Sequence, residues 1–519
     1  MSKASVLLDK AGSKKPLLYG AAALLSVGFG IFVILTAEKV NVYYPLPTAV
    51  IFGGLFFLSQ ALLIAQNRFD ALSLFIAAAC LACLTFSRVC LLYFESRDYT
   101  AFLADWVKKL GALPVREALV TPIGNYNMPY LYFLLVFSRL GIAPIISIKA
   151  LSCLFDVILA YYCMKTVMLI TEDRRLQLAS FIVALGIPSV LMNSAQWAQC
   201  DSIYVAFCVI SMYAAVKGQG RLCAIAWTLA FCFKLQAIFI LPALCVALFM
   251  GQVKPKHLLW IPIVFFATLV PALAAGRSLG SCMSIYVDQT QQYPSLYSNA
   301  PTLWRFFTGA DFEGYSNVTV FLAGASVILF IYFCLTGVKT FKPENLIRIF
   351  FISSLLVPYV LPRMHERYFY MADVMSFVYF MSNRKKWYIP VTVILSSVVG
   401  YLWYFTFAEG GSGICILDQR YIALAFLVIL ATELKEHHNT VVSALVSVGV
   451  AKRRHAVAEV VQTVEALDAA AGSGECRRLR DGVDTHLLLT AVDISEATCN
   501  RLKQRLGISH IVVAEECAV

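Results

Sequence analysis

Long apolar runs recur along this chain and constrain its fold more than any other feature. The first three lie at about residues 17–36, 45–65 and 71–93. Each is long enough to cross the hydrocarbon core of a bilayer as a helix, which takes about 20 residues. The runs predict an all-α protein that crosses a membrane many times.

The charge content agrees with this interpretation. Only 14% of the residues are charged and 60% are hydrophobic, whereas soluble domains carry about 25% charged residues. The net charge of +11 is explained by lysines and arginines in cytoplasmic loops. We therefore expect membrane lipid, and not nucleic acid, around this chain.

Basic residues in short loops set the predicted orientation. Lys14 and Lys15 place the N-terminus in the cytoplasm, and Arg174 and Lys385 mark later cytoplasmic loops. About fourteen crossings result, with both termini inside. After the first three, the crossings are predicted at about 145–169, 177–193, 202–216, a hairpin over 222–250 bent near Lys234, 258–274, 317–336, 344–360, 371–382, 387–406 and 419–433.

Two segments fall outside this alternation. The apolar piece from Pro129 to Leu140 is too short to span, so we expect an external juxtamembrane helix at the outer surface. After a membrane domain at residues 1–433, the composition changes to Ala, Val and Arg, which predicts a cytoplasmic tail over 434–519. The tail carries no catalytic motif, and an accessory or regulatory tail is the plainer interpretation. The tail is expected to form a small β-α-β unit from a strand at His486–Ala491, a helix at Ser495–Leu506 and a strand at His510–Ala514.

A polar cluster lies between two of the apolar runs, in the segment Leu361–Phe369. Arg363, His365, Glu366 and Arg367 are crowded into five residues, and desolvating them is costly, so they must face a polar cavity or the membrane surface. Two arginines suit a phosphate or diphosphate, and the histidine could donate to a phosphate oxygen. The alternative is a solvated loop that meets lipid headgroups.

An acidic cluster, Glu95–Tyr99, follows the third apolar run. A carboxylate held where a helix leaves the membrane can act as a general base, and Asp98 is our first candidate. The plainer interpretation is a surface acidic residue paired with Arg97. Asp105, seven residues further, is the second candidate.

Two more polar clusters are predicted on the outer side, and both are candidates for binding substrate. Their amide and aromatic side chains suit a sugar, although aromatic residues at this depth are ordinary membrane-interface residues. Asp201 could instead cap the helix that follows it. The candidates are Asn125, Tyr126 and Asn127 in the first cluster and Gln196, Trp197, Gln199 and Asp201 in the second.

Lys234 lies inside an apolar hairpin, two residues before Gln236, a further candidate. A lysine at mid-membrane costs about 2.5–3.5 kcal/mol on insertion scales, so it should face a cavity or a counter-charge. A phosphate that enters from the lipid would serve. A structural ion pair with Asp156 is the alternative.

Five motifs occur in a set order: an acidic residue after an early span, Asn-Tyr-Asn-Met-Pro-Tyr, Gln-Trp-x-Gln-x-Asp, Phe-Lys-x-Gln and His-Glu-Arg. This set resembles the GT-C superfamily of integral-membrane glycosyltransferases. It is most similar to bacterial proteins that resemble the GPI mannosyltransferases and the dolichyl-phosphate-glucose-dependent glucosyltransferases. The resemblance covers roughly residues 70–400 and leaves out the C-terminal tail.

The resemblance implies a mannose or glucose donor carried on a polyprenyl phosphate, with inverting transfer on the periplasmic or luminal face. It maps the catalytic base onto Asp98, and the groups that hold the lipid phosphate onto Lys234, His365 and Arg367. Met128 stands where many relatives have proline, so this chain departs from the family pattern at that turn.

From these patterns we expect a bacterial inner-membrane hexosyltransferase that acts on a hydroxyl of a glycan, lipid or protein acceptor. We expect no cofactor and no metal, because no metal-ligand spacing stands out and cations already surround the leaving phosphate. A transporter or flippase of a lipid-linked sugar is the first alternative, and a surface polysaccharide polymerase or ligase is the second.

Overall fold

A computed structural model of the chain divides into two compact units, described separately below. The first comprises Met1–Thr336 and Phe341–His437, and the second Gly337–Thr340 and His438–Val519. The structure describes residues 3–291, 295–307, 312–335, 342–408, 416–437, 487–489 and 511–513.

The first unit is built almost entirely of helices, as the apolar runs predict. In chain order the α-helices are α1 (Lys3–Thr36), α2 (Pro45–Ala65), α3 (Ala71–Leu91), α4 (Ala104–Ala112), α5 (Val115–Val120), α6 (Met128–Phe137), α7 (Pro144–Val167), α8 (Arg174–Gly186), α9 (Pro188–Leu191), α10 (Asp201–Val216), α11 (Gly220–Phe233), α12 (Leu241–Phe249), α13 (Trp260–Ala275), α14 (Leu279–Gln291), α15 (Phe312–Leu335), α16 (Pro343–Val360), α17 (Tyr370–Ser382), α18 (Tyr388–Ala408) and a last helix over 419–437.

Shorter elements join these helices. The 3₁₀ turns are η1 (Ala37–Val40), η4 (Leu235–Ile240), η5 (Pro255–Leu259), η6 (Leu303–Phe306), η7 (Glu366–Phe369) and η8 (Arg384–Lys386). Two π-helical turns are η2 (Tyr99–Leu103) and η3 (Met192–Gln196). Two short strands, β1 (Tyr297–Ser298) and β2 (Met364–His365), pair in parallel.

Seven helices among the described residues are long and apolar enough to cross a membrane, which identifies a multi-pass membrane protein. They lie in α1, α2, α3, α7, α13, α15 and α18. An eighth span results if α8 and the segment Pro188–Gln196 are one bent span, with a bend of 47°. The bend falls at Pro188, which has no backbone N–H to continue the ladder of α8.

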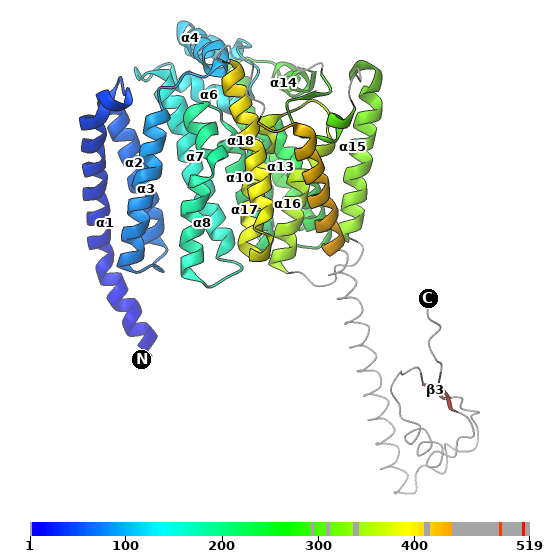
Figure 1. Cartoon of the computed structure of the whole chain (residues 1–519). Helices are drawn as coiled ribbons and strands as arrows, with labels where there is room; N and C mark the ends of the chain where they lie inside the picture. The colour runs from blue at the N-terminus through cyan, green and yellow to red at the C-terminus, as the bar shows by residue number, and fades with distance from the viewer. Residues whose placement is uncertain are drawn as a thin grey trace. The chain divides into compact units, whose positions relative to one another are not determined.

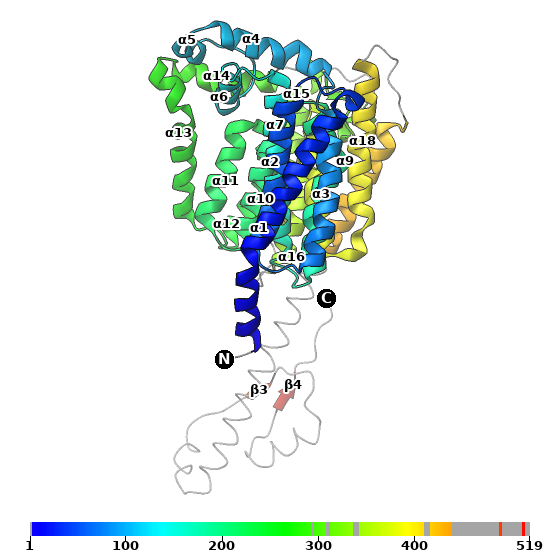
Figure 2. The same cartoon turned by 90° about the vertical axis from the view of Figure 1, so that its left-hand side faces the viewer.

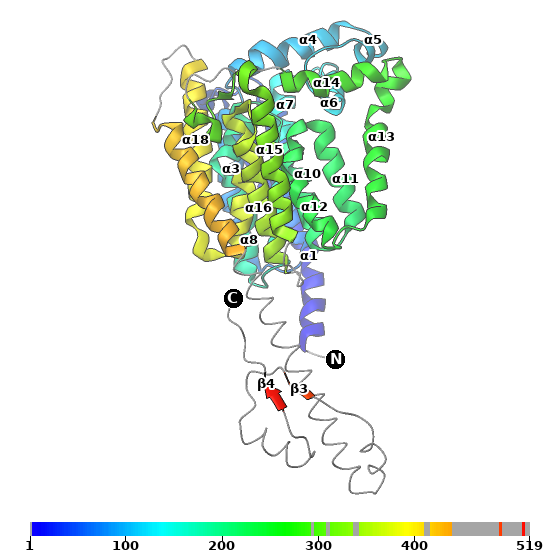
Figure 3. The same cartoon turned by 90° about the vertical axis from the view of Figure 1, so that its right-hand side faces the viewer.

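The long helices of this unit run side by side, and α4, α5, α6 and α14 lie across one end of the bundle (Figures 1 and 2). We call this end the rim. Helix α10 packs between α7 and α11 and is buried along nearly its whole length. On the side shown in Figure 3, α15 packs against α12 and α16.

Two predicted irregularities appear in the helices. The expected hairpin breaks at Lys234, which has an extended backbone (φ −155°, ψ 133°) between α11 and η4. The predicted juxtamembrane helix corresponds to α6, which packs against α4, α11 and α13. Its buried residues include Tyr130 and Leu134, so α6 is a packed part of the rim.

The second unit contributes two short described strands, β3 (Leu487–Leu489) and β4 (Ile511–Val513). They pair in parallel, with Leu488 opposite Val512. Both fall within the predicted strands of the tail. The helix predicted at Ser495–Leu506 lies outside the described residues.

Candidate functional site

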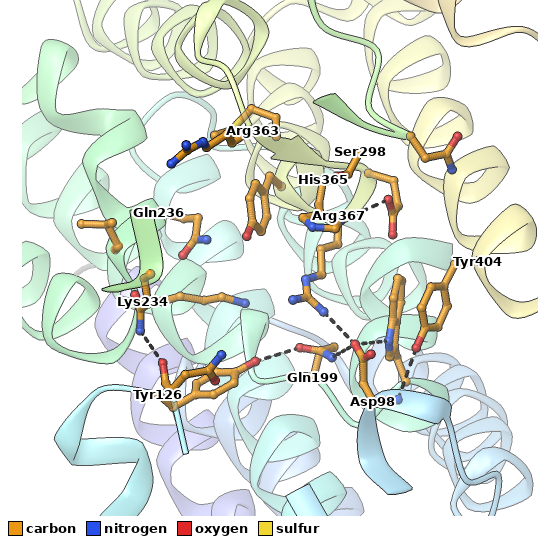
Figure 4. A pocket seen from close by; sticks show the side chains of 18 of the residues that line it. Asp98, Tyr126, Gln199, Lys234, Gln236, Ser298, Arg363, His365, Arg367 and Tyr404 are labelled. Atoms are coloured by element: carbon orange, nitrogen blue, oxygen red, sulfur yellow. Dashed lines mark hydrogen bonds and ion pairs between the residues drawn. The ribbon is translucent and has the colours of Figure 1, made fainter. Parts of the chain in front are cut away.

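A cavity of about 970 Å³ opens at the rim of the first unit. Residues far apart in the sequence line it, and Figure 4 shows part of the lining. The lining comes from the turn after α3 and the start of α4, from the segment before α6, from Trp197 and Gln199, from the break at Lys234, from the end of α14 and the segment after it, from α15, from the loop after α16, and from the end of α18.

Asp98 receives three hydrogen bonds on one carboxylate oxygen. Trp197 Nε1 donates to Asp98 Oδ2 at 3.0 Å and Gln199 Nε2 donates at 2.8 Å. Arg367 Nη1 donates to the same oxygen at 2.9 Å. Hydrogen bonds to a charged group are shorter and stronger than neutral ones, so the carboxylate is held in one orientation facing the cavity.

Unusual backbone conformations bring these donors to Asp98. The π-turn η2 begins directly after Asp98 and η3 ends directly before Trp197, and π-turns inside helices often mark functional sites. Ala198 between the two donors has φ +62°, a left-handed conformation that is uncommon for a residue other than glycine. Ser96 Oγ donates to Trp197 O at 2.7 Å, which ties the two turns together.

Lys149 secures the chain where α3 ends, just before Asp98. Its ammonium group donates to Leu91 O at 3.0 Å and to Phe94 O at 2.7 Å. The Lys149 residue is fully buried. A cation at a helix C-terminus satisfies orphan carbonyls and opposes the negative end of the helix dipole. Lys149 therefore helps to set the path of the Asp98 turn.

The Arg-Met-His-Glu-Arg loop is held by a second loop of the rim. Strands β1 and β2 pair Ser298 with His365, and Arg363 N donates to Leu296 O at 2.8 Å. Arg363 has φ +62°, and its guanidinium donates to Thr290 O. Non-glycine residues in this conformation persist only where the surroundings over-determine them.

Two ionisable groups of this loop meet neighbours inside the protein. His365 Nδ1 lies 3.7 Å from Glu366 Oε2, and Glu366 is buried. Burial alone lowers the pKa of Arg367, but the neighbouring Asp98 carboxylate raises it, and the net pKa lies well above the usual value. Arg367 is therefore a permanent cation.

Lys234 does not pair with Asp156, the partner considered from the sequence. Its ammonium group pairs with Asp201, and Asn193 Nδ2 donates to the second oxygen of Asp201 at 2.8 Å. Asp156 instead accepts from Arg88 Nη2 at 2.9 Å, deep in the bundle. The break after α11 brings Lys234 to the start of α10, where Asp201 lies. The packing of α11 against α10 therefore determines which carboxylate pairs with Lys234.

The predicted substrate-binding residues divide into two groups. Those that line the cavity are Asn125, Tyr126, Trp197, Gln199, Gln236 and Glu366, together with Asp98 and the predicted phosphate-binding residues Lys234, Arg363, His365 and Arg367. Tyr126 OH donates to Gln199 Oε1 at 3.0 Å, and Lys234 Nζ lies 5.8 Å from the centre of the Tyr126 ring. These contacts link the Lys234 side of the cavity to Asp98.

Four predicted residues do not line the cavity. Asp105 is half-exposed on α4, with its carboxylate 2.7 Å from Lys109 Nζ. Asn127 is buried and accepts from Gln289 Nε2 at 3.0 Å. Gln196 ends η3, and Asp201 is the counter-ion of Lys234 and caps no backbone N–H. The structure therefore places these four side chains outside the lining of the cavity.

Sequence patterns alone did not single out the aromatic wall of the cavity. Trp403, Tyr404 and Phe407 line it from the end of α18. The Tyr404 ring stacks on Trp197 with centroids 4.0 Å apart and planes at 23°, and its hydroxyl accepts from Asp98 N at 3.3 Å. The only signal was an aromatic-rich helix end, which is typical of any membrane interface.

Among the described residues, no group of three or more His, Cys, Asp or Glu side chains is arranged to hold a metal ion. No protein-family model matches the chain, and no curated protein is significantly similar to it in sequence. The arrangement of the cavity is therefore the basis for inferring function.

Proposed function

We propose that this protein is a GT-C-like integral-membrane glycosyltransferase that transfers mannose or glucose from a polyprenyl-phosphate donor to an acceptor hydroxyl, with inversion. In this proposal the chain crosses a bacterial inner membrane about fourteen times, with both termini and the β-α-β tail in the cytoplasm and the cavity on the extracytoplasmic face.

The observation that carries the proposal is the meeting of Asp98 and Arg367 at 2.9 Å in a cavity that Lys234, Arg363 and His365 also line. A base for a hydroxyl and cations for a phosphate are the two requirements of this reaction. Inverting transfer from a phosphate leaving group needs the base and the cations on opposite sides of the sugar.

The close-up view supports that division. Lys234 and Arg363 enter from one side of the cavity, Asp98 and Tyr404 lie on the other, and the Arg367 side chain reaches between them (Figure 4). A sugar placed between the two sides would present its anomeric carbon to an acceptor near Asp98 and its phosphate to the cations.

In the proposed reaction, the acceptor oxygen bonds to the anomeric carbon while Asp98 takes the hydroxyl proton. The bond between the anomeric carbon and the phosphate oxygen breaks, and the polyprenyl phosphate leaves with the electron pair. Arg363, Lys234 and His365 stabilise the charge that develops on that oxygen. Attack from the face opposite the phosphate gives inversion.

A transporter or flippase is the second candidate, because charged residues inside a bundle often mark a transport pathway. Arg88 and Asp156 are the clearest such charges, since both are buried in the bundle. They neutralise each other, however, and neither lines the cavity, so this observation favours a structural pair. A polysaccharide polymerase or ligase would share the donor lipid and the cationic side.

The test uses purified protein in lipid nanodiscs with a labelled polyprenyl-phosphate mannose or glucose. We expect release of the sugar to an acceptor, and a rate lower by about 10²–10⁴ in Asp98→Asn. Asp105→Asn is the matched control, because this carboxylate is on the same rim and does not line the cavity. A folded Asp98→Asn protein with full transfer activity would remove the proposed base.

Reconstitution in vesicles separates the candidates. Movement of the labelled donor between leaflets without consumption supports a transporter, whereas consumption on one face supports transfer. Repeated addition to a growing chain indicates a polymerase.

A further inference from the structure

Arg97, the residue directly before Asp98, has a side chain that the proposed reaction does not use. It lines the cavity and is exposed. In the stretches of chain that the structure describes, its guanidinium forms no hydrogen bond or ion pair. The pairing considered from the sequence, between Arg97 and a neighbouring carboxylate, is therefore not formed.

The other arginines and the lysine of the cavity are already engaged. Lys234 pairs with Asp201, Arg367 pairs with Asp98, and Arg363 donates to Thr290 O. Within the described part of the lining, Arg97 is the one guanidinium or ammonium group without an intramolecular partner. It leaves a positive charge that a ligand can neutralise.

Arg97 also belongs to a different wall of the cavity from Lys234 and Arg363, two of the cations assigned to the donor phosphate. It adjoins Asp98, and Asp98 lies across the cavity from Lys234 and Arg363 (Figure 4). Trp403, Tyr404 and Phe407 also line the cavity, and Tyr404 lies on the Asp98 side in the same view. Aromatic faces together with a charged donor suit a sugar that carries an anionic group.

The size of the cavity leaves space for a second ligand. Its volume of about 970 Å³ is at the upper end of the usual range for ligand pockets, about 300–1,000 Å³. A donor sugar with its phosphate on the Lys234 side would leave the Arg97 side free for an acceptor.

We infer that Arg97 forms an acceptor subsite that binds an anionic group, a carboxylate or a phosphate, on the acceptor sugar. This inference rests on the proposed function, because it assigns the acceptor side of the same cavity. The planar guanidinium would bind two oxygens of the anion at once. That contact would hold the acceptor hydroxyl beside Asp98.

Direct binding tests this subsite without any turnover. Protein in phosphatidylcholine nanodiscs is titrated with methyl glucuronide, with glucose 6-phosphate and with the neutral methyl glucoside. We expect at least one anionic sugar to bind about tenfold more tightly than the neutral one, and salt to weaken this preference. Glucuronide against glucose 6-phosphate distinguishes a carboxylate from a phosphate.

Arg97→Gln should abolish the preference for the anionic sugar and leave the weak binding of methyl glucoside unchanged. Arg97→Lys should restore only part of it, because lysine lacks the planar fork. Arg116→Gln is the matched control: Arg116 is an exposed arginine on α5 that donates to Ala275 O and does not line the cavity. This variant should behave like the unmodified protein.

Three results would overturn the subsite. The first is equal binding of charged and neutral sugars by the unmodified protein, and the second is an unchanged preference in Arg97→Gln. The third, measured in nanodiscs that also contain phosphatidylglycerol, is an Arg97-dependent enrichment of that lipid around the protein with no sugar preference, which would assign Arg97 to lipid headgroups. If the preference depends on Arg97 but no donor is consumed, the subsite stands and the glycosyltransferase proposal fails. If transfer proceeds without the preference, the subsite alone fails.

Discussion

Arg367 Nη1 lies 2.9 Å from Asp98 Oδ2, although 269 positions separate these residues in the sequence. Their side chains are 14% and 23% exposed, so the pair is largely shielded from water and its attraction is stronger than that of a surface pair. The turn after α3 and the loop after α16 are therefore coupled at this point.

The first prediction concerns that coupling. Arg367→Met should lower both the unfolding temperature and transfer activity, because Asp98 would lose one of its three donors. A hydrogen bond to a charged group contributes about 1.5–3 kcal/mol. Thermal unfolding of Arg367→Met, Asp98→Asn and the double variant gives the interaction energy. Purely additive losses would show that the two side chains do not interact in the membrane.

The second prediction concerns Lys234 and Asp201. Lys234→Met should be strongly destabilising, by about 3–5 kcal/mol, because it leaves a buried carboxylate without its counter-charge. The double variant Lys234→Met with Asp201→Asn should recover much of that loss. Denaturation measured for the three variants checks this, and equal stability of the single and double variants would contradict the pairing.

The third prediction concerns Gly400 in α18. A Cβ atom at this position would lie 2.7 Å from Glu366 Cβ, closer than such atoms approach one another. Gly400→Ala should therefore displace the Arg-Met-His-Glu-Arg loop and reduce stability and activity. Gly28→Ala in α1 is the control, since nothing lies within 4 Å of its added Cβ. Alanine there should be neutral or stabilising by up to about 1 kcal/mol.

The fourth prediction concerns Lys149, which acts on Asp98 through the end of α3. Lys149→Met keeps the unbranched side chain up to the ε position and removes the ammonium group that donates to Leu91 O and Phe94 O. The maximal rate should fall more than donor affinity, because the Asp98 turn loosens while the Lys234 side is unchanged. Lys149→Arg, which can still donate, should retain more activity. A fall in donor affinity alone would contradict a positioning role.

The fifth prediction concerns divalent cations. Because Lys234, Arg363 and His365 would supply the positive charge for the leaving phosphate, transfer should continue at an unchanged rate after treatment with EDTA. Initial rates before and after chelation check this. Loss of activity that added Mg²⁺ or Mn²⁺ restores would show that a metal ion shares this work.

Several site residues could be named from the sequence because an ionisable group beside or within an apolar run is costly unless a cavity or partner receives it. Asp98, Lys234 and Arg367 were found in this way, and all three line one cavity. Helical spacing, seven residues after Asp98, selected Asp105, which does not line the cavity. Periodicity does not tell which face of a short rim helix meets the cavity.

The sequence by itself determined the membrane class and much of the helix pattern. The run predicted at 45–65 is α2, and the bend predicted near Lys234 ends α11, because apolar length and backbone hydrogen bonding are properties of local segments. Only the tertiary structure decided that Lys234 meets Asp201 and not Asp156, and that Tyr404 stacks beside Asp98. Such contacts depend on the depth and rotation of helices packed against one another, and no local pattern encodes these.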